Sequence, residues 1–236
     1  MNRRQHAAQL LADYPNAVRI RIDAARDRAV PPAFESGTLR PVVILPGIYE
    51  SWHYLRPIAE RLSRAGHPVH VIPTLGLNRA PIPVTAARVW RELLARELRG
   101  VAIVAHSKGG LVGKHLMAIQ DHEARIDRLI AIASPFQGSA MARIAPTRAL
   151  RAFLPQDPVI AALGAERAVN ARITSIYPSF DPHIPDGSEL EGADNIEVPV
   201  VGHFRILLQP SVIDAVLTAV ERGAQHPAQR GVAGEG

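Results

Sequence analysis

Three side chains of the types needed for nucleophilic catalysis lie at the C-terminal ends of apolar runs in this sequence. They are Ser107, Asp181 and His203. A serine hydroxyl is a weak nucleophile at neutral pH, so it needs a base to take its proton and a carboxylate to orient that base. The chain order serine, aspartate, histidine therefore predicts attack of the serine oxygen on an acyl carbonyl.

The residues around Ser107 are typical of a nucleophile elbow, a sharp strand-to-helix turn that exposes a serine hydroxyl. The sequence from residue 101 reads Val-Ala-Ile-Val-Ala-His-Ser-Lys-Gly-Gly. Small neighbours are needed because a larger Cβ would collide inside the turn. The usual pattern is Gly-x-Ser-x-Gly, and Ala105 replaces the first glycine here, which is a mild steric change. We expect His106 to pack beside the elbow.

Short apolar runs alternate with helical patterns through most of the chain. The runs predict strands at residues 42–45, 69–72, 101–105, 129–133, 173–177 and 196–201. Helical spacing begins near Ser51, after a possible cap at Thr85, at Lys108 and around Val212. Strands that are apolar throughout predict a parallel sheet covered by helices on both faces, a doubly wound α/β fold. Ligands bind at the carboxyl ends of such strands, where all three side chains are expected.

Three segments in the second half of the chain resemble the small Bacillus-type lipases, whose elbow also begins Ala-His-Ser. These segments are residues 173–181, 190–195 and 201–208. The resemblance runs from about Val42 to Val220, with an interruption at 139–170. It implies an α/β-hydrolase fold, with a mostly parallel sheet and a small helical insertion. It also implies a serine esterase or lipase that uses no metal and no organic cofactor.

The resemblance assigns a role to each of the three side chains. Ser107 would attack the ester carbonyl, His203 would take and return the proton, and Asp181 would orient His203. Asp186 and Asp194 are alternatives for the carboxylate, and Asp186 is the stronger of the two because it lies in the same loop.

An oxyanion hole needs backbone N–H groups aimed at the developing negative charge. One is expected from Lys108, which directly follows the nucleophile. The other is expected from Ile48, in the loop after the first strand, where Gly47 permits a close approach. Pro46 stands where the family usually has histidine, which changes how the loop is held. The Lys108 side chain is expected to be exposed or paired away from the site.

These roles imply hydrolysis of small-molecule or lipid-like carboxylic esters through an acyl-enzyme intermediate. Acyl transfer, amide cleavage and non-catalytic binding of a hydrophobic ligand stay open as alternatives, because the same residues and fold serve all of them. The sequence does not define the acyl length, the choice between lipase and esterase behaviour, or the oligomeric state.

The chain divides into segments by pattern. Residues 1–40 form an N-terminal extension, with a short helix predicted at Gln5–Ala12 and either strand or helix at Val18–Ile22. Residues 41–225 form the hydrolase domain. Within it, residues 139–170 are too long for a simple crossover and are predicted to form a helical lid or cap over the sheet edge. Residues 226–236 are expected to be a flexible tail.

Composition excludes several classes of function. The net charge of +5 is spread along the chain without a basic run interleaved with aromatic residues, so no nucleic-acid partner is expected. The absence of cysteine excludes disulfides, zinc thiolate sites and cysteine nucleophiles. No run approaches about 18 apolar residues, so no membrane span is expected. The N-terminus lacks the pattern of a signal peptide, which predicts a cytoplasmic protein unless a leader has been removed.

Overall fold

Six parallel strands form one sheet in the computed structural model, which describes residues 13, 15, 17–22, 24 and 29–223. The strand order is β2-β1-β3-β4-β5-β6. The strands are β1 (Val42–Leu45), β2 (Val69–His70), β3 (Val101–His106), β4 (Ile126–Ile132), β5 (Ile173–Phe180) and β6 (Asp194–Val201). The predicted doubly wound α/β fold is confirmed, with all six strands at their predicted places. β2 is shorter than predicted, while β5 and β6 are longer.

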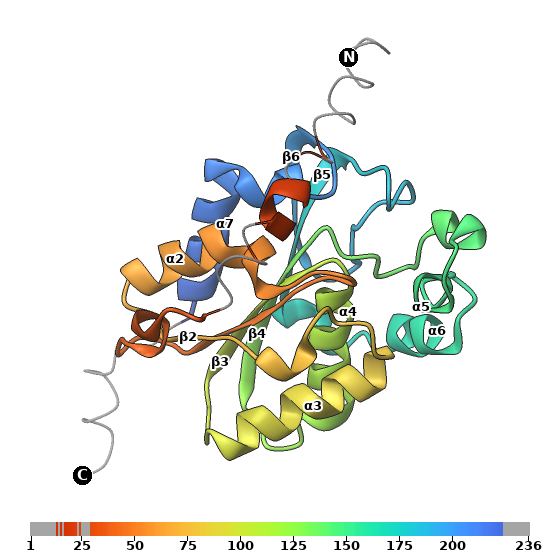
Figure 1. Cartoon of the computed structure of the whole chain (residues 1–236). Helices are drawn as coiled ribbons and strands as arrows, with labels where there is room; N and C mark the ends of the chain where they lie inside the picture. The colour runs from red at the N-terminus through yellow and green to blue at the C-terminus, as the bar shows by residue number, and fades with distance from the viewer. Residues whose placement is uncertain (1–12, 14, 16, 23, 25–28, 224–236) are drawn as a thin grey trace.

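Helices cover both faces of the sheet, as Figure 1 shows. On one face α2 (Arg56–Arg64) packs beside α7 (Pro210–Glu221), and on the other α3 (Ile82–Ala95) packs beside α4 (Lys108–His115). Alternate residues of β1 divide between the two cores, with Val42 and Ile44 facing α2 and α7. Val43 and Leu45 belong to the core with α3 and α4. Burial on both faces explains why the strand is apolar throughout.

The start of α3 differs from the prediction. Thr85 does not cap this helix, which begins three residues earlier at Ile82, after Pro81. Proline is well suited to a first helical turn because its fixed φ is helical and its missing N–H has no partner there. The Thr85 hydroxyl instead donates to the carbonyl of Ala80, 3.3 Å away, and to Asn78 Oδ1, also at 3.3 Å.

The described part of the N-terminal extension packs on the core. Residues 17–22 are helical, which decides between the strand and the helix left open for this stretch. Ala17 and Ile20 join the buried cluster that contains Trp52 and Tyr54. The Tyr54 hydroxyl donates to the Ala17 carbonyl at 3.2 Å. The helix predicted at Gln5–Ala12 and the tail at 226–236 lie outside the described residues.

Short helices make up the inserted segment at the carboxyl edge of the sheet. They are η5 (Ala140–Ile144), α5 (Arg148–Arg151), α6 (Pro158–Ala165) and η6 (Asn170–Arg172). Figure 1 shows α5 and α6 beyond α4, at the side of the molecule. Further 3₁₀ turns are η1 (Pro32–Glu35), η2 (Trp52–Leu55), η3 (Pro73–Leu75) and η7 (Arg205–Leu208), and α4 continues into a π-helical turn at Leu116–Gln120. No helix in the described part of the chain has the length and apolar composition needed to span a bilayer.

Candidate active site

A sharp turn between β3 and α4 places Ser107 at the carboxyl edge of the sheet. Ser107 has φ 51° and ψ −120°, a strained conformation for a residue with a side chain. A Cβ added at Gly109 would lie 2.2 Å from the Leu45 carbonyl oxygen, and one at Gly110 would lie 2.1 Å from Ser134 Oγ. The two glycines therefore let α4 start close against the sheet, which is the strand-to-helix turn predicted for an elbow.

Asp181 and His203 lie directly after β5 and β6 and contact each other. Their closest atoms, Asp181 Oδ2 and His203 Nδ1, are 2.6 Å apart, and both side chains are buried. The other carboxylate oxygen of Asp181 accepts from the backbone N–H groups of His183 at 2.8 Å and Ile184 at 3.2 Å. The carboxylate is thus fixed by its own loop and aimed at the imidazole.

The electrostatics of this pair favour a carboxylate beside a basic imidazole. Burial acts to raise the pKa of Asp181, but the charge of His203 and the hydrogen bonds to the carboxylate outweigh it, so this pKa lies below its usual value. Burial acts to lower the pKa of His203, and the Asp181 carboxylate more than offsets it, so this pKa lies above its usual value. Burial and the nearby His203 lower the pKa of His183 to about 4, so His183 is neutral at pH 7.

Ser107 and His203 line the same cavity, which has a volume of about 520 Å³. Its walls are largely apolar and include Met141, Leu150 and Phe153 from the inserted segment. Within the described part of the chain no hydrogen bond joins the Ser107 hydroxyl to the His203 imidazole. Catalytic hydrogen bonds are often long in unliganded enzymes and shorten when substrate binds.

The loop after β1 brings one of the two expected oxyanion donors, Ile48, to this cavity. Ile48 lines it, and Lys108 is the first residue of α4, where a backbone N–H has no partner within the helix. Neither N–H is bonded to another described residue. The loop is held on both sides, since Gly47 N–H donates to Glu50 Oε2 at 2.7 Å and Tyr49 N–H donates to the Leu77 carbonyl at 2.8 Å.

A buried carboxylate, Glu50, links this loop to His203 through His106. The Glu50 oxygens lie 2.8 and 2.9 Å from His106 Nδ1, and His106 Nε2 lies 3.0 Å from the His203 carbonyl oxygen. A carbonyl only accepts, so Nε2 carries a proton. The bond on the Nδ1 side needs a second proton, on the imidazole or on the carboxylate. The Glu50–His106 pair therefore shares one proton and has no net charge.

Glu50, His106 and His203 also offer metal-ligating atoms within 4.8 Å of one another. These side chains already hydrogen-bond within the protein, as both ring nitrogens of His106 and Nδ1 of His203 have partners. We therefore interpret the cluster as a hydrogen-bonded network. His106 packs beside the elbow, as expected from the sequence.

Asp13, from the N-terminal extension, holds the backbone around His203. Its carboxylate accepts from the N–H groups of His203 at 2.8 Å, Phe204 at 3.0 Å and Arg205 at 2.7 Å, and it is fully buried. Gly202 has φ +119°, and a Cβ there would lie 2.8 Å from Asp13 Oδ1. The positive φ therefore favours glycine at this position, and the missing side chain leaves room for the Asp13 carboxylate.

The Lys108 side chain was expected to be exposed or paired elsewhere, and it is buried and paired with the 78–80 loop. Its Nζ donates to the Asn78 carbonyl at 2.7 Å and to Asn78 Oδ1 at 2.9 Å. Burial and the charge of Arg88 lower the pKa of Lys108 to about 7, while the oxygen acceptors favour the charged form. The side chain therefore anchors the 78–80 loop to the elbow and points away from the cavity that Ser107 lines.

The two alternative carboxylates have other partners. Asp186 accepts from the Ala140 N–H at 2.7 Å, at the start of the inserted segment. Asp194 forms an ion pair with Arg222. Neither contacts His203, so among the three candidates Asp181 is the one that the fold brings to the imidazole.

Three residues of the site were missed by sequence reasoning. Glu50 has a weak signal, an acidic residue three positions after the glycine of a predicted oxyanion loop. His183 also has one, since it lies two residues after Asp181. Asp13 has none, because it lies in the extension that the family resemblance does not cover.

Comparison with known proteins gives weak sequence similarity and clear structural similarity. No protein-family model matches the sequence. Lysosomal thioesterase PPT2 of Bos taurus is 29% identical over 115 residues, covering 45% of this chain and 37% of that protein. The Homo sapiens thioesterase is 28% identical over 115 residues, and the match covers the same fractions of the two chains. The match thus spans little more than a third of the relatives' length.

Several solved structures share the architecture. Aspergillus fumigatus lipase B aligns with a TM-score of 0.66 and 18% identity, covering 85% of this chain and 57% of that one. The mature Bacillus licheniformis lipase BlEst2 aligns with a TM-score of 0.60 and 14% identity, covering 80% of this chain and 94% of that one. An extracellular alpha/beta-hydrolase from a Paenibacillus species aligns with a TM-score of 0.54 and 14% identity, covering 79% of this chain and 100% of that one. The chain therefore has the α/β-hydrolase fold, which it shares with these lipases.

Proposed function

We propose that this protein is a serine hydrolase that cleaves carboxylic, lipid-like esters through an acyl-enzyme intermediate. The observation that carries the proposal is the buried 2.6 Å contact between Asp181 and His203, together with the fact that His203 lines the same cavity as Ser107. A histidine oriented by a carboxylate beside a strained serine is the arrangement that activates a hydroxyl.

The reaction follows from these positions. Ser107 Oγ attacks the ester carbonyl while its proton passes to His203 Nε2. The N–H groups of Ile48 and Lys108 stabilise the oxyanion, and each such donor is typically worth about 3 kcal/mol of barrier. His203 then protonates the departing alcohol, which leaves an acyl group on Ser107. Water then attacks that acyl group while His203 takes its proton, and His203 returns this proton to Ser107 Oγ as the bond to the acyl group breaks and the acid is released.

The apolar walls supplied by the inserted segment favour hydrophobic acyl chains. We propose that residues 139–170 act as a lid, since Met141 and Ile144 line the cavity and yet are 43% and 76% exposed. Initial rates on esters of increasing chain length, below and above the micellar threshold, test this. A lid predicts that long chains are favoured only above the threshold.

Thioester cleavage is a second candidate for the same site, because the curated relatives are thioesterases. Attack of Ser107 on a thioester carbonyl uses the same proton transfer and the same oxyanion donors. Comparison of an oxygen ester with the thioester of the same acyl group decides between the two. The cytoplasmic location predicted from the sequence stays a prediction, and the relatives are named as lysosomal.

Replacement of the nucleophile tests the proposed function directly. Ser107→Ala is expected to abolish turnover of p-nitrophenyl butyrate and labelling by a fluorophosphonate probe, because both require Oγ. Ser36→Ala, at an exposed serine, is the control. Hydrolysis of p-nitrophenyl butyrate by Ser107→Ala at the wild-type rate would rule the proposal out.

A further inference from the structure

A second and larger cavity lies next to the one that contains Ser107. Its volume is about 850 Å³, and Arg21, Tyr49 and Tyr54 line both cavities. The two therefore share a wall, and Tyr49 stands at that wall, one residue after the oxyanion donor Ile48. The proposed acyl-enzyme mechanism does not use this second cavity.

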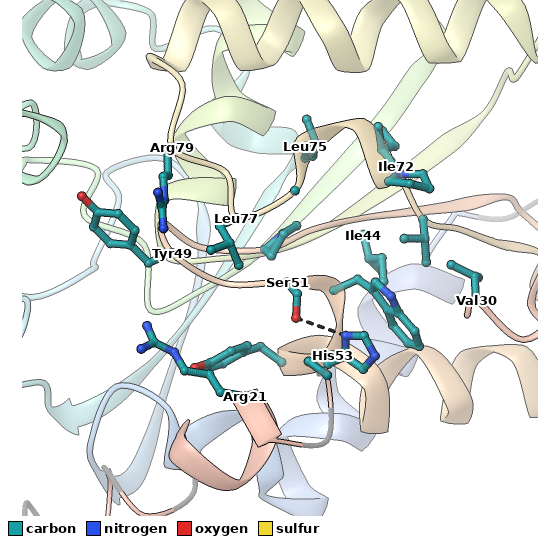
Figure 2. A pocket seen from close by; sticks show the side chains of 17 residues that line it. Arg21, Val30, Ile44, Tyr49, Ser51, His53, Ile72, Leu75, Leu77 and Arg79 are labelled. Carbon is teal, nitrogen blue, oxygen red and sulfur yellow. Dashed lines mark hydrogen bonds between the residues drawn. The ribbon is translucent and has the colours of Figure 1, made fainter. Parts of the chain in front are cut away.

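The second cavity is cationic at one end. Figure 2 shows Arg21 and Arg79 on either side of Tyr49, toward the same end of the cavity. The Arg79 guanidinium lies 5.3 Å from the centre of the Tyr49 ring. Both arginines are exposed, and within the described residues no carboxylate forms an ion pair with either. Two guanidinium groups that form no ion pair with a described carboxylate make this end attractive to an anion.

The opposite end is apolar. Figure 2 shows Val30 and Ile72 there, away from the arginines. The rest of the lining includes Ile44, Leu75 and Trp52, which are all buried. The cavity thus combines a charged mouth beside the active site with an interior that is hydrophobic apart from Ser51 and His53, which hydrogen-bond to each other.

A ligand that matches this cavity carries a phosphate or carboxylate next to an apolar portion. Guanidinium groups bind both anions through paired hydrogen bonds, whereas an apolar interior excludes charge. In the neighbouring cavity the inserted segment already supplies an apolar wall for the acyl chain. The leaving-group half of the substrate, on the other side of the ester oxygen, would then extend past Tyr49 into the second cavity.

We propose that this second cavity binds the leaving-group half of the ester substrate, and that this half carries an anionic group held by Arg21 and Arg79. This inference rests on the proposed function, because it takes Ser107 as the point where the ester is cleaved. It adds a substrate class, esters with an anionic and partly apolar leaving group, that the catalytic residues alone do not define.

A matched pair of substrates tests the charge preference. 3-Carboxyphenyl butyrate has an anionic leaving group, and 3-carbamoylphenyl butyrate is its neutral analogue. The wild type is expected to have a higher kcat/KM for the anionic ester. In the Arg21→Gln, Arg79→Gln double variant the ratio of the two kcat/KM values is expected to fall about two- to thirtyfold, which is the range for two exposed charge pairs.

Arg64→Gln is the control, since Arg64 is exposed and lines neither cavity. It is expected to keep the wild-type ratio. A wild type without charge preference, or a ratio that is the same in the wild type and the double variant, would overturn the inference.

A binding measurement separates failure of this inference from failure of the proposed function. Octyl phosphate, octanoate and uncharged octanol are titrated into the wild type and the double variant by calorimetry. Binding of the phosphate or the carboxylate, lost in the double variant and absent for octanol, supports the cavity even if neither ester is hydrolysed. Equal binding of all three compounds, or no binding of any, contradicts it. The anion that binds more tightly identifies the group that the leaving-group half of the substrate carries.

Discussion

His203 is fixed at several points before any substrate binds. Asp181 bonds its Nδ1, Asp13 accepts from its backbone N–H, and His106 donates to its carbonyl oxygen. Nε2 has no hydrogen-bond partner among the described residues. The imidazole is therefore oriented in advance, with one ring nitrogen left to take a proton, which reduces the reorganisation required in the reaction.

Removal of the Asp181 charge is expected to change both the rate and its pH dependence. The base must be neutral, so kcat/KM rises with pH through the pKa of His203, which the carboxylate holds above its usual value. Asp181→Asn is expected to lower kcat by about 10³- to 10⁴-fold and to move the inflection to lower pH. A pH–rate profile checks this, with Asp186→Asn as the control. An inflection that stays in place would contradict the assignment of Asp181.

Glu50 is expected to act as a positioning residue. Glu50→Ala removes the acceptor for Gly47 N–H and His106 Nδ1, and each buried donor left unsatisfied costs about 1–3 kcal/mol. We expect lower thermal stability and a fall in kcat with little change in KM, since the proposed roles of Ile48 and His203 are in the transition state. Glu50→Gln keeps one oxygen acceptor, so its kcat and its thermal stability should fall less. A Glu50→Ala variant with the wild-type kcat would contradict this role.

The three principal side chains of the candidate site could be predicted from the sequence, because each is of a suitable type and lies where an apolar run ends. The pattern places Ser107, Asp181 and His203 at one sheet edge without any knowledge of side-chain contacts. The supporting contacts could not be predicted in this way. Glu50 and His106 are 56 residues apart, and their pairing depends on how the loop after β1 folds over the elbow.

At the scale of elements, strands were easier to predict than helix starts. A strand buried on both faces is apolar throughout, and such runs mark β1 and β3 directly. A helix start depends on competing local signals. Pro81 and Thr85 both favour one, and the proline begins α3 while the threonine hydroxyl bonds to Ala80.

A hydrogen bond connects the loop after β1 to the inserted segment. The Tyr49 hydroxyl lies 2.9 Å from the hydroxyl of Thr147, which caps α5 by accepting from Leu150 N–H. Tyr49→Phe removes this bond and keeps the ring. We expect faster backbone hydrogen exchange across 140–151 in this variant, because the segment loses a tether to the core. Tyr177→Phe is the control, and unchanged exchange in Tyr49→Phe would show that the bond does not restrain the segment.

At the scale of the whole molecule, the N-terminal extension is part of the candidate active site. Asp13→Ala leaves three backbone N–H groups near His203 without their acceptor. We expect a loss of stability and a fall in kcat/KM of about 10- to 100-fold, the size of effect that small displacements of a catalytic group produce. Thermal melting and ester kinetics measure both, with Asp214→Ala as an exposed control. Wild-type kinetics in Asp13→Ala would show that His203 is held without the extension.

Asp13 and His203 are separated by 190 positions, so their contact closes nearly the entire polypeptide into one loop. Closures of that length are entropically expensive and form late compared with local contacts. During synthesis the carboxylate leaves the ribosome long before the backbone that it will clamp. The onset of catalytic turnover in a refolding experiment should then lag behind the appearance of helical signal, since the reacting centre is completed only when the two ends of the chain have met.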